Sequence, residues 1–456
     1  MADGQSEKLY VLVTGANSGL GFSICCRLID EFLQMRPQSQ SLVLILTTRD
    51  REKADDTVHR LRQHLFKHCR RAERTIPGVS MLLQRRIHFE SETLDLTSLI
   101  SVQLLARRLL DTVPRLDALV LNAGIGGWTA INWPLAIYLT VTDLFDATTY
   151  PIYKIAKTGW LAKRQLPSKA GAEGAEFSSP VDEPRLGQIF CANVFGHYLL
   201  AHYLVPTLSR GAQSGTGGRI IWISSIEGGL ASLLSRSDIM GLASKTPYES
   251  SKRLTDILAL TYDLPSTAPW VDRFLAMPTR PPAQPNAKAG SDPSGSTSRP
   301  KVYVAHPGIC FTAIMPIPWI LQMCQLLVFY FVRLLGSVWH VVDSYSGATA
   351  PVWLILTPQT RLDEIERKGG KGKWGSGCDR WGRNKVLRSE VEHYGIGGIV
   401  GQEIPPESAG KHSKPLTEED KGLFEEEGRE CWKQMEEMRE LWERKLEEAL
   451  GERVVG

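Results

Sequence analysis

The chain begins with an apolar run that ends in glycine and leads directly into a helical pattern. LYVLVTG occupies residues 9–15, and the helical pattern extends from Leu20 to about Leu33. This arrangement predicts a buried strand, a tight turn and a helix. It constrains the fold strongly, because a strand that is apolar on both faces must have helices covering both sides of its sheet.

The same alternation recurs along the chain. Further apolar strands are predicted at residues 41–49, 86–96, 116–124, 218–225 and 301–308, and helices at 52–65, 99–110, 187–210 and around 248. Strands that alternate with helices are typical of a parallel sheet. We therefore predict an α/β, doubly wound parallel sheet.

Several segments interrupt this pattern. Within a main body of residues 1–358, inserts lie near 129–186 and 226–245, and residues 276–300 have the proline, glycine and serine composition of a disordered surface loop. Residues 359–456 form a charged C-terminal extension. Its last part predicts a surface helix docked on the body, with an apolar stripe formed by Trp432, Met435, Met438, Trp442, Leu446 and Leu450.

A further apolar stretch, residues 317–342, allows three interpretations. It contains Gln322, Gln325 and Arg333, and its uninterrupted part is shorter than the ~20 residues of a spanning helix. Its many aromatic residues favour a helix that lies at a membrane surface. A core helix that covers a substrate pocket and a true membrane span remain the alternatives.

Charge and cysteine content exclude several classes of function. The net charge of +3 is small for 456 residues, and no basic stripe is interleaved with aromatic residues, so nucleic acid is not an expected partner. The eight cysteines lack C-x-x-C spacing, which argues against a disulfide framework and against a metal site. No secretory signal precedes the first strand, and a reducing, cytosol-facing location is expected.

The glycine-rich turn TGANSGLG, residues 14–21, joins the first strand to the first helix. Gly15 permits the tight turn, Gly19 allows the backbone to approach a pyrophosphate, and Gly21 allows close helix packing. Ser18 and Leu20 lie in the same turn, where the helix N-terminus supplies amide donors. This motif, in this context, predicts a dinucleotide site.

The end of the second strand indicates which dinucleotide binds. Enzymes that bind NAD place an acidic residue there, whereas this chain has Thr48 and Arg49, with Asp50 only afterwards. Arginine forms a fork that suits a ribose 2′-phosphate. NADPH is therefore the expected cofactor, unless Arg49 simply pairs with Asp50 or Glu52 on the surface.

TPYESSK, residues 246–252, separates a tyrosine from a lysine by one helical turn. Tyr248 and Lys252 therefore project from the same helix face. An ammonium group near a phenol favours the phenolate and lowers the pKa of the phenol toward a range useful for proton transfer. A tyrosine and a lysine at this spacing also occur by chance in chains of this length.

Taken together, these motifs resemble those of the short-chain dehydrogenase/reductase family, whose members have a Rossmann fold. The family order is met by TGANSGLG, by LDL with Asp95 near the adenine, by LNAG with Asn122 and Ala123, by ISS and by YESSK. The resemblance covers residues 9 to about 312.

The resemblance implies a catalytic set. Tyr248 would be the general acid in carbonyl reduction, and Lys252 would hold the nicotinamide ribose and lower the phenol pKa. Ser225 would hydrogen-bond the substrate carbonyl, and Asn193 would help to hold a proton-relay water. Ser224 is the alternative to Ser225, because an inserted loop lengthens the spacing to Tyr248.

The segment HPGICFT resembles another motif of the family. It implies that the Ile309 backbone contacts the nicotinamide carboxamide. Thr312 would bind the carboxamide or a phosphate, or would act only as a helix cap.

Within the family, the chain most resembles fungal 3-ketosteroid reductases of sterol C-4 demethylation in ergosterol biosynthesis. The resemblance rests on the insert after NAGIGGW, on IFCANVFGHYLLAHYLVPTL and on WISSIEG. It implies reduction of the 3-keto group of 4-methyl sterol intermediates to a 3β-hydroxyl with NADPH, at the cytosolic face of the endoplasmic reticulum or on lipid droplets.

Expected partners are the sterol, the membrane surface, other enzymes of sterol C-4 demethylation and a second subunit that pairs through the helices of Asn193 and Tyr248. A reductase of another lipophilic ketone and a non-enzymatic NADPH-binding scaffold remain the alternatives.

Overall fold

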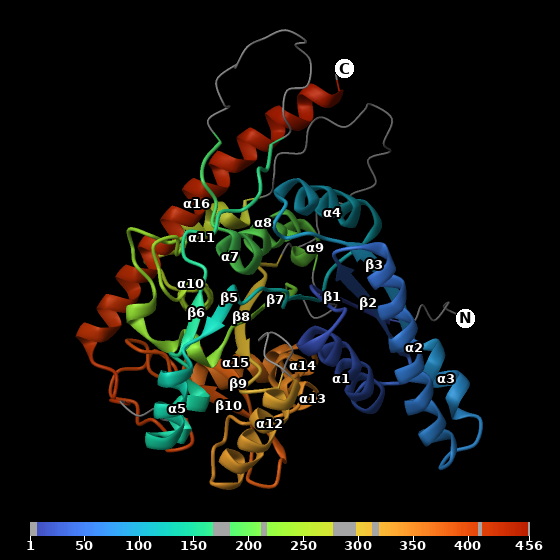
Figure 1. Ribbon diagram of the computed structural model, residues 1–456. Coiled ribbons are helices and arrows are strands. Elements are labelled where there is room, and N and C mark those ends of the chain that lie inside the picture. Colours follow the sequence, from blue (N-terminus) through green and yellow to red (C-terminus); the bar gives the residue numbers. More distant parts are fainter. Residues whose placement is uncertain are drawn as a thin grey trace.

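A computed structural model describes residues 7–166, 183–210, 217–276, 298–311, 319–408 and 413–454. Eight strands form one twisted sheet at the centre of the molecule (Figure 1). They are β1 (Glu7–Val13), β2 (Gln40–Thr48), β3 (Ile87–Thr93), β4 (Ala118–Leu121), β7 (Arg219–Ile223), β8 (Lys301–His306), β9 (Lys373–Cys378) and β10 (Asn384–Ser389). The strand order is β10-β9-β8-β7-β4-β1-β2-β3, and all neighbours are parallel except β9 and β10. The predicted doubly wound parallel sheet is confirmed.

Helices cover both faces of the sheet, as the apolar strands require. One face packs against α1 (Gly19–Met35), α2 (Arg51–Glu73) and α14 (Thr349–Leu356). The other face packs against α4 (Leu99–Thr112), α8 (Gly196–Tyr203) and α10 (Pro247–Leu260). A short α7 (Gln188–Phe190) and a π-helical turn (Cys191–Phe195) lead into α8, and α9 (Val205–Ser209) follows it.

The insert after β4 forms a small separate layer at one end of the sheet. It consists of the antiparallel hairpin β5 (Trp128–Ile131) and β6 (Lys154–Ala156), with α5 (Trp133–Thr142) and α6 (Leu144–Thr149) between the two strands. The second insert contains two 3-10 turns (Ile226–Gly229 and Ala231–Leu233). Further helices are α3 (Val79–Arg85), α11 (Ala268–Leu275), α13 (Ser344–Gly347) and α15 (Gln359–Gly369). Most of the loop predicted at 276–300 lies outside the described residues.

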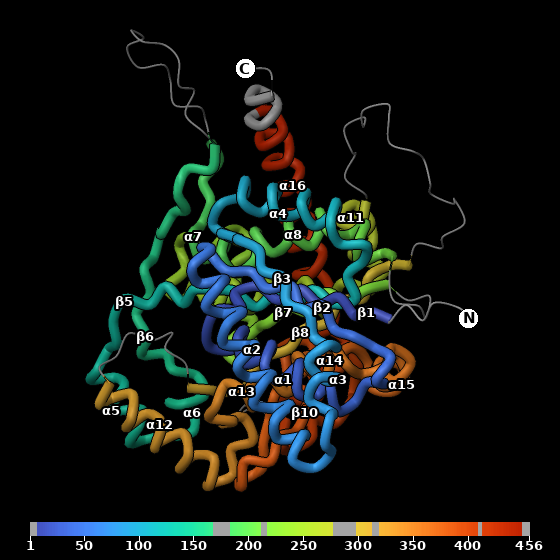
Figure 2. Tube along the Cα trace, turned by 90° about the vertical axis from the view of Figure 1, so that its right-hand side faces the viewer, coloured from blue at the N-terminus to red at the C-terminus, as the bar shows by residue number. Residues whose placement is uncertain are grey.

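The apolar stretch predicted at 317–342 contains α12 (Trp319–Leu334), which is shorter than the predicted segment. α12 contacts α6, which packs on α5, and Figure 2 shows this group at one corner of the molecule. In the described part of the chain, no helix has both the length and the apolar character needed to cross a membrane.

The C-terminal extension is more closely integrated than its predicted boundary at residues 358 and 359 suggests. β9 pairs with β8, and β10 pairs with β9, so the extension supplies one edge of the main sheet. The sequence did not reveal this, because β9 reads KWGSGC and lacks the long apolar run of the other strands.

The last helix, α16 (Glu418–Val454), lies across α10 and α11 (Figure 1). Its buried side chains belong to the same core as α8 and α10, and Trp432 Nε1 donates a hydrogen bond to Thr261 Oγ1 at 3.1 Å. The buried side chains of α16 include four from the predicted apolar stripe, Trp432, Met435, Trp442 and Leu446. A second subunit that used the covered face of α10 would have to displace α16.

Candidate active site

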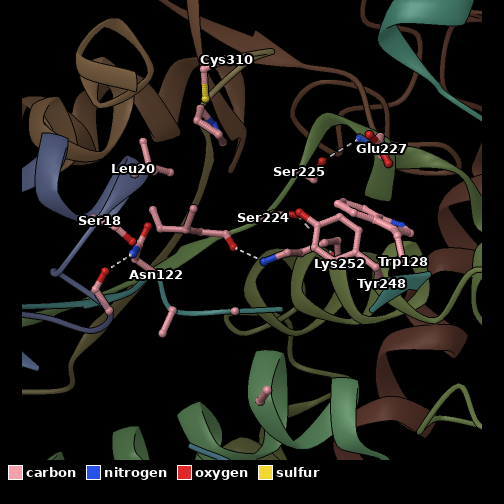
Figure 3. A pocket seen from close by; sticks show the side chains of 18 of the residues that line it. Ser18, Leu20, Asn122, Trp128, Ser224, Ser225, Glu227, Tyr248, Lys252 and Cys310 are labelled. Atoms are coloured by element: carbon pink, nitrogen blue, oxygen red, sulfur yellow. Dashed lines mark hydrogen bonds between the residues drawn. The ribbon is translucent and has the colours of Figure 1, made fainter. Parts of the chain in front are cut away.

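A cavity of about 590 Å³ extends from the turn between β1 and α1 to α12. The carboxyl ends of the strands form its floor, which is where ligands bind in open α/β sheets. Fifteen of the candidate site residues from the sequence line this cavity: Gly15, Ser18, Gly19, Leu20, Gly21, Thr48, Arg49, Asp95, Asn122, Ala123, Ser224, Ser225, Tyr248, Lys252 and Ile309. Figure 3 shows several of them, with Ser18, Leu20 and Asn122 grouped apart from Ser225 and Tyr248.

The glycine turn has the shape that a pyrophosphate requires. Gly15 and Gly19 have φ values of 66° and 52°, which favour glycine. A Cβ on Gly21 would lie 2.2 Å from the Gly15 carbonyl oxygen, so a larger residue would displace the turn. Ser18 precedes α1 without a side-chain cap, which leaves the first amides of the helix for a ligand. These features fit a dinucleotide.

Thr14 holds the two loops together, and sequence reasoning had not assigned it a role. Its Oγ1 accepts hydrogen bonds from the backbone amides of Asn122 at 2.8 Å and Ala123 at 3.1 Å. The Asn122 side chain in turn donates to the Thr14 carbonyl at 2.9 Å. The loop after β4 is therefore fixed against the glycine turn. In the sequence, the only local indication of this role is that Thr14 directly precedes the first glycine of the turn.

Two cationic side chains line the cavity near the end of β2. Arg49 is exposed, and Lys53 of α2 lines the same part of the cavity. Asp50, the first surface partner suggested for Arg49, instead caps α2 and pairs with Lys53 at 2.5 Å. Asp95 lies opposite, where its carboxylate accepts hydrogen bonds from the backbone amide and hydroxyl of Thr97.

The structure brings Tyr248, Lys252 and Ser225 together. The Lys252 Nζ lies 5.5 Å from the centre of the Tyr248 ring and donates to the Ile223 carbonyl at 2.8 Å. Ser225 follows β7, and its Oγ accepts from the Glu227 amide at 3.3 Å, which leaves the hydroxyl proton for a partner in the cavity.

The two candidate serines point to different partners. Ser224 is buried, and its hydroxyl donates to the Lys252 carbonyl at 3.4 Å. Ser225 is the serine that hydrogen-bonds Tyr248. The geometry therefore favours Ser225 as the residue that contacts a substrate carbonyl.

The pKa of Tyr248 differs from the lowered value that the tyrosine and lysine spacing implied. Burial raises its pKa well above the usual range, and the carboxylates of Glu227 and Glu249 raise it further, while the hydrogen bond with Ser225 lowers it. Burial lowers the pKa of Lys252 to about 8. The phenol therefore keeps its proton at neutral pH, as an acid in carbonyl reduction must.

Asn193 does not line the cavity but supports it from behind. It lies in the π-helical turn before α8, and its side-chain oxygen accepts from the Ile125 amide at 2.8 Å. Its amide nitrogen donates to the Ile125 carbonyl at 3.0 Å and to Ser251 at 3.1 Å. The side chain therefore fixes the loop after β4 against α10.

The backbone of Ile309 is already paired. Its amide donates to the Trp339 carbonyl at 2.7 Å, and its carbonyl accepts from the Val342 amide at 3.1 Å. A cofactor carboxamide can therefore reach only the second lone pair of that carbonyl, and not the amide. Thr312 lies outside the described residues.

Comparison with known proteins decides the family. The chain is 46% identical to the 3-keto-steroid reductase erg27 of Aspergillus fumigatus over 97% of this chain and 96% of that protein. It is 38% identical to the 3-keto-steroid reductase ERG27 of Gibberella zeae over 96% of this chain and 94% of that protein. The chain belongs to the 3-keto-steroid reductase family.

Other comparisons are less specific. Among solved structures, it resembles an NADP complex of Pseudomonas aeruginosa RhlG, with a TM-score of 0.40 and 18% identity over 76% of this chain and 90% of that one. It resembles a 7α-hydroxysteroid dehydrogenase with a TM-score of 0.40 and 13% identity, over 77% of this chain and 89% of that one. No protein-family model matches the chain.

In this member of the 3-keto-steroid reductase family, a buried charge cluster lies beside Tyr248. Lys154 of β6 forms ion pairs with Glu227 and with Glu249, the latter at 2.8 Å. Trp128 packs edge-on against the Tyr248 ring, with centroids 4.9 Å apart, and the Lys154 Nζ lies 4.2 Å from the centre of the Trp128 ring. Because these residues are far apart in the sequence, no local pattern predicted the cluster.

Proposed function

We propose that the chain uses NADPH to reduce the 3-keto group of 4-methyl sterol intermediates to the 3β-hydroxyl in sterol biosynthesis. The observation that carries the proposal is the convergence of Ser225, Tyr248 and Lys252 on one cavity in a chain that is 46% identical to a 3-keto-steroid reductase. Arg49 and Lys53 at the far end of the cavity support NADPH over NADH, because both cations can bind a 2′-phosphate.

The proposed chemistry divides the cavity between cofactor and ketone. The glycine turn, Asn122 and the two cations would hold the dinucleotide, which supplies a hydride from its nicotinamide ring. Ser225 would donate a hydrogen bond from its hydroxyl group to the ketone oxygen, keep its own proton and stabilise the charge that develops there. Tyr248 would transfer its phenolic proton to the same oxygen, and Lys252 would hold a ribose hydroxyl beside the phenol.

Steady-state assays of the purified chain in detergent, with a 4α-methyl 3-ketosterol and NADPH, test this proposal. We expect formation of the 3β-alcohol and a loss of turnover of about a thousandfold or more in Tyr248→Phe, because the proton donor is removed. NADPH binding, measured by nucleotide fluorescence, should persist in the variant. Tight NADPH binding without sterol turnover by the wild-type chain would contradict the substrate assignment and favour another lipophilic ketone.

We also propose that the chain works on a membrane, at the cytosolic face of the endoplasmic reticulum. α6 contacts both α5 and α12 at one corner of the molecule (Figure 2). The three helices expose large apolar side chains. Ile137 of α5 is 63% exposed and Leu327 of α12 is 69% exposed. The exposed set also includes Trp133, Tyr138, Val141, Phe145, Trp319, Ile320, Met323 and Phe331. An exposed patch of this kind suits insertion into a lipid surface.

The same helix connects this surface to the cavity. Gln325 and Phe329 of α12 line the cavity, whereas Leu327 faces outward. A sterol bound in a membrane would therefore reach Tyr248 along α12 without crossing water, provided that the apolar face of the helix rests in the lipid.

Vesicle flotation with neutral phosphatidylcholine tests the membrane proposal. We expect Ile137→Glu and Leu327→Glu each to weaken vesicle association by about tenfold, because each replaces an apolar side chain that would contact lipid with a charged one. Met81→Glu is the matched control, since Met81 of α3 is equally exposed at 64% but lies away from α5 and α12. Equal losses in all three variants would contradict the assignment of the membrane face.

A further inference from the structure

Lys373, in the first position of β9, is completely buried. Its Nζ forms an ion pair with the Asp256 carboxylate at 2.5 Å, and the side chains of both residues are 0% exposed. The same Nζ donates a hydrogen bond to the Ser225 carbonyl oxygen at 2.7 Å. A residue of the C-terminal extension therefore contacts the backbone of the serine that faces the cavity.

The partner of Lys373 connects it to the second catalytic element. Asp256 lies one helical turn after Lys252 on α10, so the two residues project from the same helix face. Lys373 therefore joins the Ser225 carbonyl to Asp256, and the Asp256 carboxylate acts on Lys252 through its charge. Ser225 and Lys252 are both labelled in Figure 3. The pair joins β9, α10 and the end of β7, three segments that are far apart in the sequence.

Stability alone does not explain this arrangement. A buried ion pair costs more in desolvation than it typically returns, and replacing such a pair by apolar residues is often neutral or stabilising. The hydrogen bond to the Ser225 carbonyl gives this pair a second effect, because it fixes the backbone at the position where the hydroxyl must meet a substrate.

We propose that Lys373 is a positioning residue of the reductase, which fixes Ser225 through its carbonyl oxygen and sets the charge beside Lys252 through Asp256. The proposal rests on the roles proposed above for Ser225 and Lys252. It assigns a function to the C-terminal extension that its charged composition did not indicate.

The electrostatics around Lys252 agree with this geometry. Burial lowers the pKa of Lys252 to about 8, the Asp256 carboxylate acts to raise it and the Lys373 ammonium acts to lower it. Among the described residues, the other titratable groups that face Lys252 are Tyr248 of α10 and His197 of α8. Burial lowers the pKa of His197 to about 3, so that His197 is neutral. Lys373 and Asp256 are therefore the two charges whose removal should shift the pKa of Lys252 in opposite directions.

Three variants test the proposal: Lys373→Met, Asp256→Asn and the double variant. In the wild-type enzyme, we expect deprotonation of Lys252, whose pKa is lowered to about 8, to end activity at alkaline pH. We expect this alkaline limb to move to higher pH in Lys373→Met, to lower pH in Asp256→Asn and back toward the wild-type position in the double variant. Lys373→Met and the double variant should also lose kcat by between about tenfold and a hundredfold, since both release the Ser225 backbone.

The control is Lys371→Met, two residues earlier. Lys371 pairs with Asp263 outside the cavity, so its loss should leave both kcat and the alkaline limb unchanged. Thermal unfolding of every variant shows whether it is folded. The double variant removes both charges together and keeps the test valid if Lys373→Met alone, with an unpaired Asp256, fails to fold.

A purely structural pair would give a different result. Folded variants with wild-type kcat and an unmoved alkaline limb would overturn the proposal, whatever their thermal stability. The test of Lys373 does not depend on the proposed sterol substrate, because the same pH profiles can be measured with any ketone that the enzyme reduces. Absence of sterol turnover in the wild-type enzyme would contradict the proposed substrate and leave the test of Lys373 intact.

Discussion

The two ends of the cavity are built in different ways. The cofactor end consists of backbone and small side chains: the glycine turn, Thr14 and the loop of Asn122, held by hydrogen bonds between β1 and β4. The substrate end consists of large side chains from inserts: Trp128 and Lys154 from the hairpin after β4, and Phe329 from α12. The first end is defined by local backbone geometry and the second by contacts between distant segments, so substitutions should affect them differently.

Apart from the loss of turnover already expected for Tyr248→Phe, the largest effect is expected from Gly21→Ala. The added Cβ would lie 2.2 Å from the Gly15 carbonyl oxygen, so the turn must shift. An overpacking cost of ~3 kcal/mol corresponds to NADPH binding that is weaker by about a hundredfold. Nucleotide fluorescence measures this change. Gly19→Ala is the control, because no atom lies within 4 Å of its Cβ and only the strain of φ 52° remains. Equal losses in both variants would show that strain, and not close packing, limits the turn.

Arg49→Ala should produce a smaller and more selective effect at the same end. Loss of one charge-assisted hydrogen bond to a 2′-phosphate would raise KM for NADPH by about tenfold and leave KM for NADH unchanged. Lys53→Ala should add to the effect, since Lys53 lines the same region. Parallel kinetics with the two nucleotides measure the preference. An equal rise in KM for NADH would show that Arg49 contacts a group that both nucleotides share, and not the 2′-phosphate.

The smallest effect is expected at the substrate end, from Glu227→Gln. Burial raises the pKa of Glu227 to about 7, so its charge, which raises the pKa of Tyr248, is present above that pH. Alcohol oxidation requires the phenolate, and removing the charge should therefore increase the oxidation rate by a few fold above about pH 7, with little change below it.

Rates of alcohol oxidation across the pH range measure this difference. Glu92→Gln is the control, since Glu92 pairs with Arg108 at the opposite edge of the sheet. A rate change in Glu227→Gln of the same size at every pH would contradict the electrostatic explanation.

The contrast between the two ends also explains what the sequence could predict. The glycine turn, Asn122 and the Tyr248 and Lys252 pair are local signals, since each depends on residues a few positions apart, and the structure places them all on one cavity. The lowered phenol pKa was wrong, because spacing alone shows neither burial nor the facing Glu227 and Glu249. The choice between Ser224 and Ser225 as the catalytic serine required the structure, because the two adjacent residues differ in where their hydroxyl groups point.

The C-terminal extension illustrates the same limit. α16 was predicted as a docked helix because its apolar residues repeat at helical spacing. β9 was not predicted, since its glycines and serine give no apolar pattern, and Lys373 looks like an ordinary surface lysine until β9 is placed beside β8. No local sequence pattern indicates contacts between distant segments, such as that of Lys373 with Asp256, which are 117 positions apart.

The position of β9 has a consequence for synthesis of the protein. A ribosome that has translated the tyrosine and lysine of α10 has not yet supplied Lys373, so Asp256 lacks its partner and the Ser225 carbonyl lacks its donor. The core contacts of α16 come later still, from residues beyond 418. A chain that terminates before residue 373 therefore carries the glycine turn and the tyrosine and lysine motif but lacks the buried contacts that Lys373 makes with Ser225 and Asp256.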